Sequence, residues 1–300
     1  MNLTQISSLT ESEAREYLER LRWHNGVHCA HCNSVEITKL SGKAHREGTY
    51  QCNGCREQFS VTVHTIMEDS HIPLKKWIMA FHLMCSNKKG ISSLQLQRDL
   101  GLGSYRTALF MTHRIRLAMS KDSCVKDKLK GIVEVDETYI GGKPRKGEDK
   151  ENKRGRGTKK TPVMVLVERD GDAKAKPMKR LSAKELKSEI RENVDLASRI
   201  ITDDFKSYRG LRKEFSGGHV VIKHSEGEYS RDGINTNTAE SFFALIKRGH
   251  YGIFHHLSKQ HLHRYSDEFA FRWNHRKISD GERREIAIKQ ASGKRLVYSR

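Results

Sequence analysis

The sequence has no apolar run that approaches the roughly 18 residues needed to cross a lipid bilayer. The first residues, MNLTQISSLTESEAREYL, also lack the positively charged and then apolar segments of a secretion signal. Hydrophobic residues make up only 36% of the 300 residues, which is little for one compact core but sufficient for two or three small ones. These absences argue against membrane-spanning and secreted proteins and predict a cytoplasmic protein of about two domains.

Acidic residues are scarce relative to basic ones. The chain has 37 Asp and Glu against 56 Lys and Arg, a formal net charge of +19. A surplus of that size predicts a polyanionic partner, and without an apolar run nucleic acid fits better than acidic lipid. By composition alone, a basic protein that merely binds RNA remains an alternative.

Cysteine is also sparse, but four of the six cysteines form two CxxC pairs, Cys29 with Cys32 and Cys52 with Cys55. In a chain without a secretion signal this pattern indicates metal binding rather than disulfides. Each CxxC turn supplies two thiolates, and the hairpin between the turns brings them together around one Zn²⁺. We therefore predict a structural four-cysteine zinc site, with four reduced thiols in a small core as the alternative.

The remaining metal-binding residue types are expected to stay out of such sites. Four thiolates close the zinc shell, so His28 and His31 are not expected as ligands. Cys85 and Cys124 are isolated and are expected to be small buried residues. Five histidines lie between His250 and His263, where a second metal site is an alternative.

Helical patterns flank and follow the cysteine segment. Their residue ranges are 11–23, 74–87, 91–101 and 104–119. A Gly-bearing turn at Leu102–Gly103 separates the last two, which predicts a helix-turn-helix. In this interpretation Arg114 and Arg116 bind DNA; plain packing of a helical bundle is the alternative.

From Gly131 onward the pattern changes to strands alternating with helices. Strands are expected at 132–142, 163–171, around 176–181, at 198–204 and at 219–225, and helices at 182–194 and 237–249. Ser182 is expected to cap the first of these helices, with Glu185 three residues later. The order predicts a mixed α/β domain.

Three acidic residues stand out in this second half. Asp136 lies inside the strand-like run IVEVDETYIG, Asp203 ends the run RIITD, and Glu240 lies near the start of a helix. A carboxylate in an apolar strand is costly unless a cation offsets its charge. Three converging carboxylates would repel one another unless divalent metal neutralised them, and Mg²⁺ prefers such hard oxygen ligands.

Each acid also has an alternative interpretation. Asp136 could lie in a turn at a strand end. Asp203 could cap the segment that follows it, and Asp204 could be the ligand instead. Glu240 could form a capping box with Asn237.

Cations accompany the acids. Lys247 follows Glu240 by seven residues, two helical turns, and so shares its face. It could contact a DNA phosphate, as could the neighbouring Arg248, although an exposed helical lysine is common. Residues 143–160 carry nine Lys or Arg and three acids, and are expected to form a mobile loop that either contacts phosphate or is simply solvated.

Three segments resemble the bacterial DDE insertion-sequence transposases of the ISXO-like group, whose members also have an N-terminal zinc ribbon followed by helices. The segments are VDETYIGGK, ITDDFKSYRGL and the 42-residue block from Asn235 to Arg276, and the resemblance covers about Leu18 to Arg276. It implies a ribonuclease H-like catalytic domain, in which the first and fourth strands are neighbours.

On the matched motifs, the resemblance places Asp136, Asp203 and Glu240 at the three catalytic, metal-binding acids, with Lys247 as the lysine that follows. Some relatives have a catalytic asparagine, which makes Asn237 a rival to Glu240. Two positions depart from the family pattern: Asn235 replaces a common His, and Phe243 replaces a common Trp. Neither change removes a carboxylate.

The resemblance further implies catalytic Mg²⁺ or Mn²⁺, double-stranded DNA as the partner at the element ends and the target, and a homodimer or larger assembly at a bacterial nucleoid. The expected domains are an N-terminal helix and zinc ribbon at 1–65, a helix-turn-helix region at 66–126, the catalytic domain at 127–280 and a basic tail at 281–300. The rival hypotheses are a structure-specific nuclease on the same fold and a DNA-binding regulator without catalysis.

Overall fold

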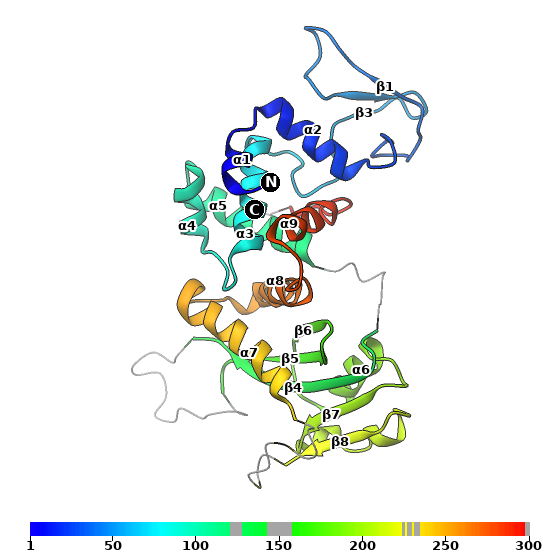
Figure 1. Ribbon diagram of the computed structural model, residues 1–300, viewed down its shortest axis with the longest axis vertical. Helices are drawn as coiled ribbons and strands as arrows, with labels where there is room; N and C mark the ends of the chain where they lie inside the picture. The colour runs from blue at the N-terminus through cyan, green and yellow to red at the C-terminus, as the bar shows by residue number, and fades with distance from the viewer. Residues whose placement is uncertain (121–127, 143–157, 224–225, 227–229, 231–234, 298–300) are drawn as a thin grey trace. The chain divides into compact units, whose positions relative to one another are not determined.

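The computed structural model describes the chain except residues 121–127, 143–157, 224–225, 227–229, 231–234 and 298–300. The chain forms two compact units (Figure 1). Unit 1 contains Met1–Lys121 and Lys277–Arg300, and unit 2 contains Asp122–Arg276. No helix in the described part of the chain is long and apolar enough to cross a membrane. Cys124 and most of the charged segment 143–160 lie outside the described residues.

Unit 1 combines a small antiparallel sheet with helices. Its elements are α1 (Leu3–Ser7), α2 (Glu11–Arg22), β1 (Ile37–Lys39), β2 (Tyr50–Cys52), β3 (Gln58–Phe59), α3 (Leu74–Ser86), α4 (Ser93–Leu100), α5 (Tyr105–Met119) and α9 (Asp280–Lys289). The order β1-β2-β3 is a meander of neighbouring strands. Local sequence sets the helix ends. The side chains of Ser92 and Ser104 cap the N-termini of α4 and α5, and α4 ends at Gly101, which has a left-handed φ of 56°. The zinc ribbon and the helical region, expected as separate domains, thus belong to one unit.

Residues 281–300, expected as a basic tail, lie mostly within α9 and the segment after it, which pack in unit 1. A capping box between Ser279 and Glu282 starts α9, which contacts α2, α3 and α5. Its cations act inside the unit: Arg283 donates to the carbonyl of Cys85 at 2.7 Å, and Arg284 donates to the carbonyl of Met1 at 2.8 Å. The segment differs from a tail because these arginines bind backbone carbonyls inside the unit.

Unit 2 is built on a five-stranded mixed sheet. Its strands are β4 (Ile132–Ile140), β5 (Thr161–Glu168), β6 (Ala173–Pro177), β7 (Arg199–Asp203) and β8 (His219–Ile222), in the order β6-β5-β4-β7-β8. The first three pair antiparallel, whereas β4, β7 and β8 pair parallel. The first and fourth strands along the chain of unit 2, β4 and β7, are therefore neighbours in the sheet, as expected. The third strand begins earlier than the range predicted for it.

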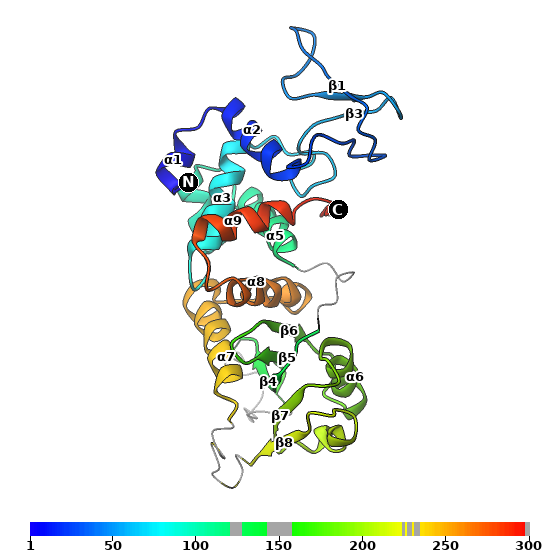
Figure 2. The same ribbon diagram turned by 45° about the vertical axis from the view of Figure 1, so that its right-hand side comes forward.

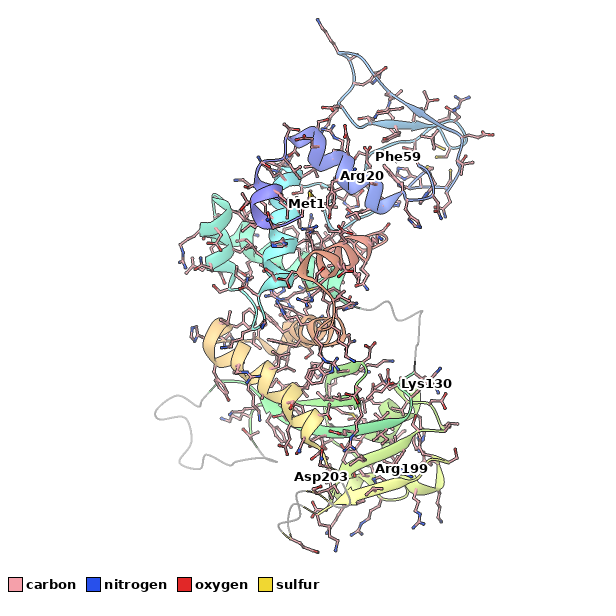
Figure 3. The ribbon with its side chains drawn as sticks, in the orientation of Figure 1. Met1, Arg20, Phe59, Lys130, Arg199 and Asp203 are labelled. Atoms are coloured by element: carbon pink, nitrogen blue, oxygen red, sulfur yellow. The ribbon has the colours of Figure 1, made fainter. Side chains whose placement is uncertain are left out.

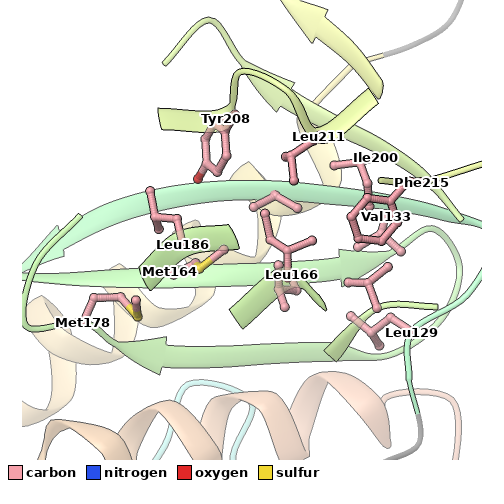
Figure 4. Close-up of a cluster of buried hydrophobic side chains, with 13 residues drawn as sticks. Leu129, Val133, Met164, Leu166, Met178, Leu186, Ile200, Tyr208, Leu211 and Phe215 are labelled. Carbon is pink, nitrogen blue, oxygen red and sulfur yellow. The ribbon is translucent and has the colours of Figure 1, made fainter. Parts of the chain in front are cut away.

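Helices cover both faces of this sheet (Figure 2). They are α6 (Ala183–Asn193), the 3-10 turns η1 (Lys206–Tyr208) and η2 (Leu211–Lys213), α7 (Asn237–Gly249), the π-helical turn η4 (His250–Phe254), η5 (Lys259–His261) and α8 (Leu262–Asn274). Side chains alternate along β5: Met164 and Leu166 pack with α6, η1 and η2 (Figure 4), whereas Val163 and Val165 pack with α7 and α8. β5 has a continuous apolar run, Val163 to Val167, because both of its faces are buried.

Candidate active site

The register of two parallel strands places Asp136 beside Asp203. Val135 of β4 is paired with Thr202 of β7, the last pair of that ladder. One residue further, Asp136 and Asp203 occupy adjacent strands on the same face, where neighbouring chains are about 4.8 Å apart. Figure 3 marks Asp203 at the end of β7. The predicted convergence of these two carboxylates is therefore present.

A third carboxylate joins them, and the sequence did not single it out. Oxygen atoms of Asp136, Glu137 and Asp203 all lie within 4.8 Å of one another. Strand alternation directs Glu137 to the other face of β4, toward the buried Tyr208. Burial and the neighbouring charges of Glu137 and Asp203 raise the pKa of the Tyr208 hydroxyl well above its usual value. The signal that could have indicated it was the pair of adjacent acids, Asp136 and Glu137, in the same strand-like run.

Glu240 and Lys247 approach Asp136 from α7. Burial, followed by the charges of Asp203 and Glu240, raises the pKa of Asp136 to about 7, although the Glu137 amide and the Lys247 charge lower it. Glu240 is exposed and does not belong to the compact cluster of three carboxylates. Lys247 is also exposed, two turns further along the same helix. The site is thus a half-buried acid surrounded by further acids, a set of hard oxygen donors that suits a divalent cation.

The alternative roles of these residues are resolved in part. Asp203 both joins the cluster and accepts the Phe205 amide at 3.1 Å, so it also caps the following turn. Asp204 is exposed and outside the cluster of described residues. The residue before α7 is Thr236, which makes no side-chain cap, so Asn237 and Glu240 form no capping box.

The four paired cysteines meet in unit 1. Their sulfur atoms lie within 4.8 Å of one another, with Cys29 and Cys55 at 3.6 Å and Cys32 and Cys52 at 3.6 Å. A tetrahedral site with Zn–S bonds of ~2.3 Å requires S–S separations of about 3.8 Å, close to those observed. The Cys55 amide donates to the Cys52 sulfur at 3.4 Å, an interaction that favours the metal-binding thiolate.

These two groups are the metal-binding clusters among the described residues. Neither His28 nor His31 belongs to the cysteine cluster, and the segment His250–His263 forms no cluster there. Cys85 is fully buried in α3, as predicted.

Two predicted DNA contacts are wrong. Arg116 is 0% exposed and Arg114 only 9% exposed. Arg114 donates to the carbonyls of Ile66 and Glu68 at 2.9 Å each, so it holds the unit together instead of facing a phosphate. The exposed cation of α5 is Arg106, in its first turn.

Comparison with known proteins identifies both parts of the chain. Residues 128–274 match the model of the ISXO2-like transposase domain, and residues 9–58 match the model of the transposase zinc-ribbon domain. The chain is an ISXO2-like transposase. The transposase domain match contains Asp136, Asp203, Glu240 and Lys247, and the zinc-ribbon match contains all four paired cysteines. The sheet of unit 2 accordingly has the predicted ribonuclease H-like arrangement.

One curated relative resembles nearly the whole transposase. An uncharacterized protein in transposable element ISH50 of Halobacterium salinarum is 27% identical over 278 residues, covering 88% of this chain and 91% of the relative. Two solved structures are similar at 15% identity over 71% of this chain and 74% of theirs: the Mos1 strand transfer complex, with a TM-score of 0.29, and the Mos1 transposase paired-end complex with left transposon end, with a TM-score of 0.28.

Proposed function

We propose that this transposase binds the terminal inverted repeats of its mobile element at the nucleoid, cuts the DNA at the element's ends and joins the freed ends to target DNA. The observation that carries the proposal is the placement of Asp136 in register with Asp203. Glu240 and Lys247 of α7 support it, because both lie near enough to shift the pKa of Asp136.

The carboxylates of Asp136, Asp203 and Glu240 hold the catalytic divalent ions, for which Mg²⁺ or Mn²⁺ is suited. Divalent ions held by these residues would activate the attacking oxygen and stabilise the leaving oxygen of an in-line phosphoryl displacement. The acids therefore serve as ligands, and the chain needs no nucleophilic side chain. Lys247 and Arg248, exposed on α7, bind phosphates beside the acids.

The order of steps follows from one site acting twice. The acids first position a water molecule against the phosphodiester at the element's end. The same acids then position the freed 3′-hydroxyl against a phosphodiester of the target DNA. Both ends of the element must be handled together, so we propose that the transposase acts as a homodimer or a larger assembly on DNA.

The DNA ends are bound by unit 1. Its zinc ribbon, held by a four-cysteine Zn²⁺ site, contacts the backbone, and the turn between α4 and α5 directs the first turn of α5 toward the bases. Tyr105 is 50% exposed there, and Arg106 is exposed next to it. An arginine at this position of a recognition helix can donate two hydrogen bonds to a guanine edge.

The proposal is tested with an oligonucleotide that ends in the element's terminal repeat, a supercoiled target and Mg²⁺. The parent protein should cleave the oligonucleotide and join it to the target. Asp136→Asn, which keeps the size of the side chain, should lose both reactions by at least about a hundredfold, because metal ligation supplies several kcal/mol of transition-state stabilisation. Cleavage without joining would instead indicate a nuclease. Repeat binding without either reaction would indicate a regulator.

A further inference from the structure

Glu134 lies on the same face of β4 as Asp136, two residues before it, and is 0% exposed. Its carboxylate contacts the start of α7. One oxygen accepts the backbone amides of Thr238 at 2.8 Å and Ala239 at 3.0 Å. The other accepts the Thr238 hydroxyl at 2.9 Å and the Arg169 Nε at 2.9 Å.

These amides are the ones that a capping side chain ordinarily satisfies. Thr236 is the residue before the first turn of α7 and makes no side-chain cap, so the second and third helical amides have no local acceptor. Glu134 supplies that acceptor from a strand more than 100 residues earlier in the chain. Its negative charge also lies at the positive end of the α7 dipole.

Arg169, in the turn after β5, completes the arrangement. Besides Glu134, it donates to the carbonyl of Asn235 at 3.0 Å and lies 3.4 Å from the Asn235 side-chain oxygen. That same side-chain oxygen accepts the Asn237 amide at 3.1 Å. The approach to α7 and its first turn are thus tied to the centre of the sheet by one ion pair, in which Glu134 is buried and Arg169 is partly buried.

We propose that Glu134 is a positioning residue for metal binding. Glu240 directly follows Ala239, whose amide Glu134 holds, and Asp136 lies on the same strand face as Glu134. One carboxylate therefore fixes the separation between an acid of the sheet and an acid of the helix. The inference rests on the proposed function, in which Asp136 and Glu240 share divalent ions.

If Glu134 had a purely structural role, its loss would lower stability as the loss of any buried carboxylate does, with no specific effect on metal binding. A buried ion pair is not in general a stabilising choice over apolar packing of the same volume. Unit 2 contains a second pair of this kind, Glu268 with Arg272 in α8, at 2.6 Å and with side chains 0% and 4% exposed. This pair does not contact the first turn of α7 in the described bonds, and it is therefore a matched control for the loss of a buried carboxylate charge.

The experiment measures binding of Mn²⁺ alone to the zinc-loaded, DNA-free protein, by the paramagnetic resonance of free Mn²⁺, together with the thermal midpoint. Glu134→Gln keeps the shape of the side chain, but its amide NH₂ is itself a donor and would face the backbone amides, the hydroxyl and the guanidinium that donate to Glu134. It should weaken Mn²⁺ binding about 10- to 100-fold, the range found for residues that orient metal ligands. Glu268→Gln should lower the thermal midpoint but leave Mn²⁺ binding unchanged.

Asp136→Asn separates the two proposals. If it binds Mn²⁺ as tightly as the parent, the metal site of the proposed function is wrong. If it loses binding while Glu134→Gln binds like the parent, the positioning role is overturned and the metal site stands. Equal weakening by Glu134→Gln and Glu268→Gln also overturns the role, because it would reflect general destabilisation.

Should Glu134→Gln not fold, Thr238→Val takes its place. This change removes one hydroxyl donor to Glu134 and leaves both backbone amides, so Mn²⁺ binding should weaken by about three- to tenfold, less than the full value of one hydrogen bond to a charged group. Thr238→Ser keeps the hydroxyl and should restore parental binding. Parental Mn²⁺ binding by folded Thr238→Val would contradict the proposal.

Discussion

Asp136 lies beside Asp203 because the parallel ladder between β4 and β7 ends one residue before them. The position is set by backbone hydrogen bonds and does not depend on a flexible loop. Two carboxylates on adjacent strands are held close whether or not a cation is present, and burial together with the charge of Asp203 raises the pKa of Asp136. This rigidity makes the consequences of single substitutions predictable.

The identity of the third acidic ligand is tested by two isosteric changes. Glu240→Gln should reduce single-turnover cleavage by at least about a hundredfold, because it removes a metal ligand. Glu137→Gln should retain most activity, because its side chain is directed toward Tyr208 on the other face of the sheet. Rapid-quench measurement of both variants decides the matter: the reverse order of activities would assign the third ligand to Glu137.

The stability of the metal-free protein should depend on pH through Asp136. Its folded pKa of about 7 exceeds the model value of 3.8, so the folded state keeps a proton that the unfolded chain releases. Stability contributed by this group is therefore present at low pH and is lost as pH rises through 7. Between pH 5 and pH 8 the loss should be about 3 kcal/mol.

Denaturant unfolding of the parent and Asp136→Asn at the two pH values measures this contribution. The asparagine does not titrate, so the variant should gain stability relative to the parent as pH rises. Adding Mg²⁺ at pH 8 should stabilise the parent and leave the variant nearly unchanged. A pH-independent difference between the two proteins would contradict the assigned shift.

The cysteine cluster should be required for zinc and for the fold of the ribbon. Cys52→Ser should release the metal and unfold the ribbon, because zinc-binding free energies of about 10–16 kcal/mol in zinc-finger peptides are folding free energies. Zinc content and binding of repeat DNA should fall together. Cys85→Ser, a change at a buried cysteine outside the cluster, should keep its zinc; loss of zinc in both variants would argue against a four-cysteine site.

Arg106 and Arg114 should behave oppositely although both lie on α5. Arg106→Ala should weaken binding of the terminal repeat by about 1–3 kcal/mol, roughly 10- to 100-fold, and relax specificity at one base pair. Arg114→Met should instead lower the free energy of unfolding by about 1–3 kcal/mol, because two carbonyls lose their donor. Fluorescence anisotropy with repeat DNA and thermal melting distinguish these effects, and a folded Arg114→Met that loses only DNA affinity would restore the earlier prediction.

Strand patterns made the central part of the site predictable. Apolar runs that end in an acid specified Asp136 and Asp203, and the parallel pairing of their strands brought them together. Glu134 escaped notice although it stands in the same apolar run. The argument that a buried carboxylate needs a cation applied equally to it, but its partners Arg169 and Thr238 are distant in sequence and only the folded chain reveals them.

The two buried arginines of α5 were mispredicted for a different physical reason. Their positive charge suggested a surface, but buried positions continue around the whole C-terminal part of the helix, from Met111 to Arg116. A helix buried all round has no polar face, and its cations must bind carbonyls or acids inside the protein. In α9, likewise, the basic residues counted as a tail include Arg283 and Arg284, which are buried donors.

Unit 1 is assembled from both ends of the sequence, with α9 packed against helices made more than 160 residues earlier. The ribosome therefore synthesises α9 only after all five strands of the unit 2 sheet. Until then the carbonyls of Cys85 and Met1 lack their arginine donors. Unit 1 is therefore completed last in biosynthesis, so a polypeptide that ended before α9 would contain the acids of unit 2 but an incomplete unit 1.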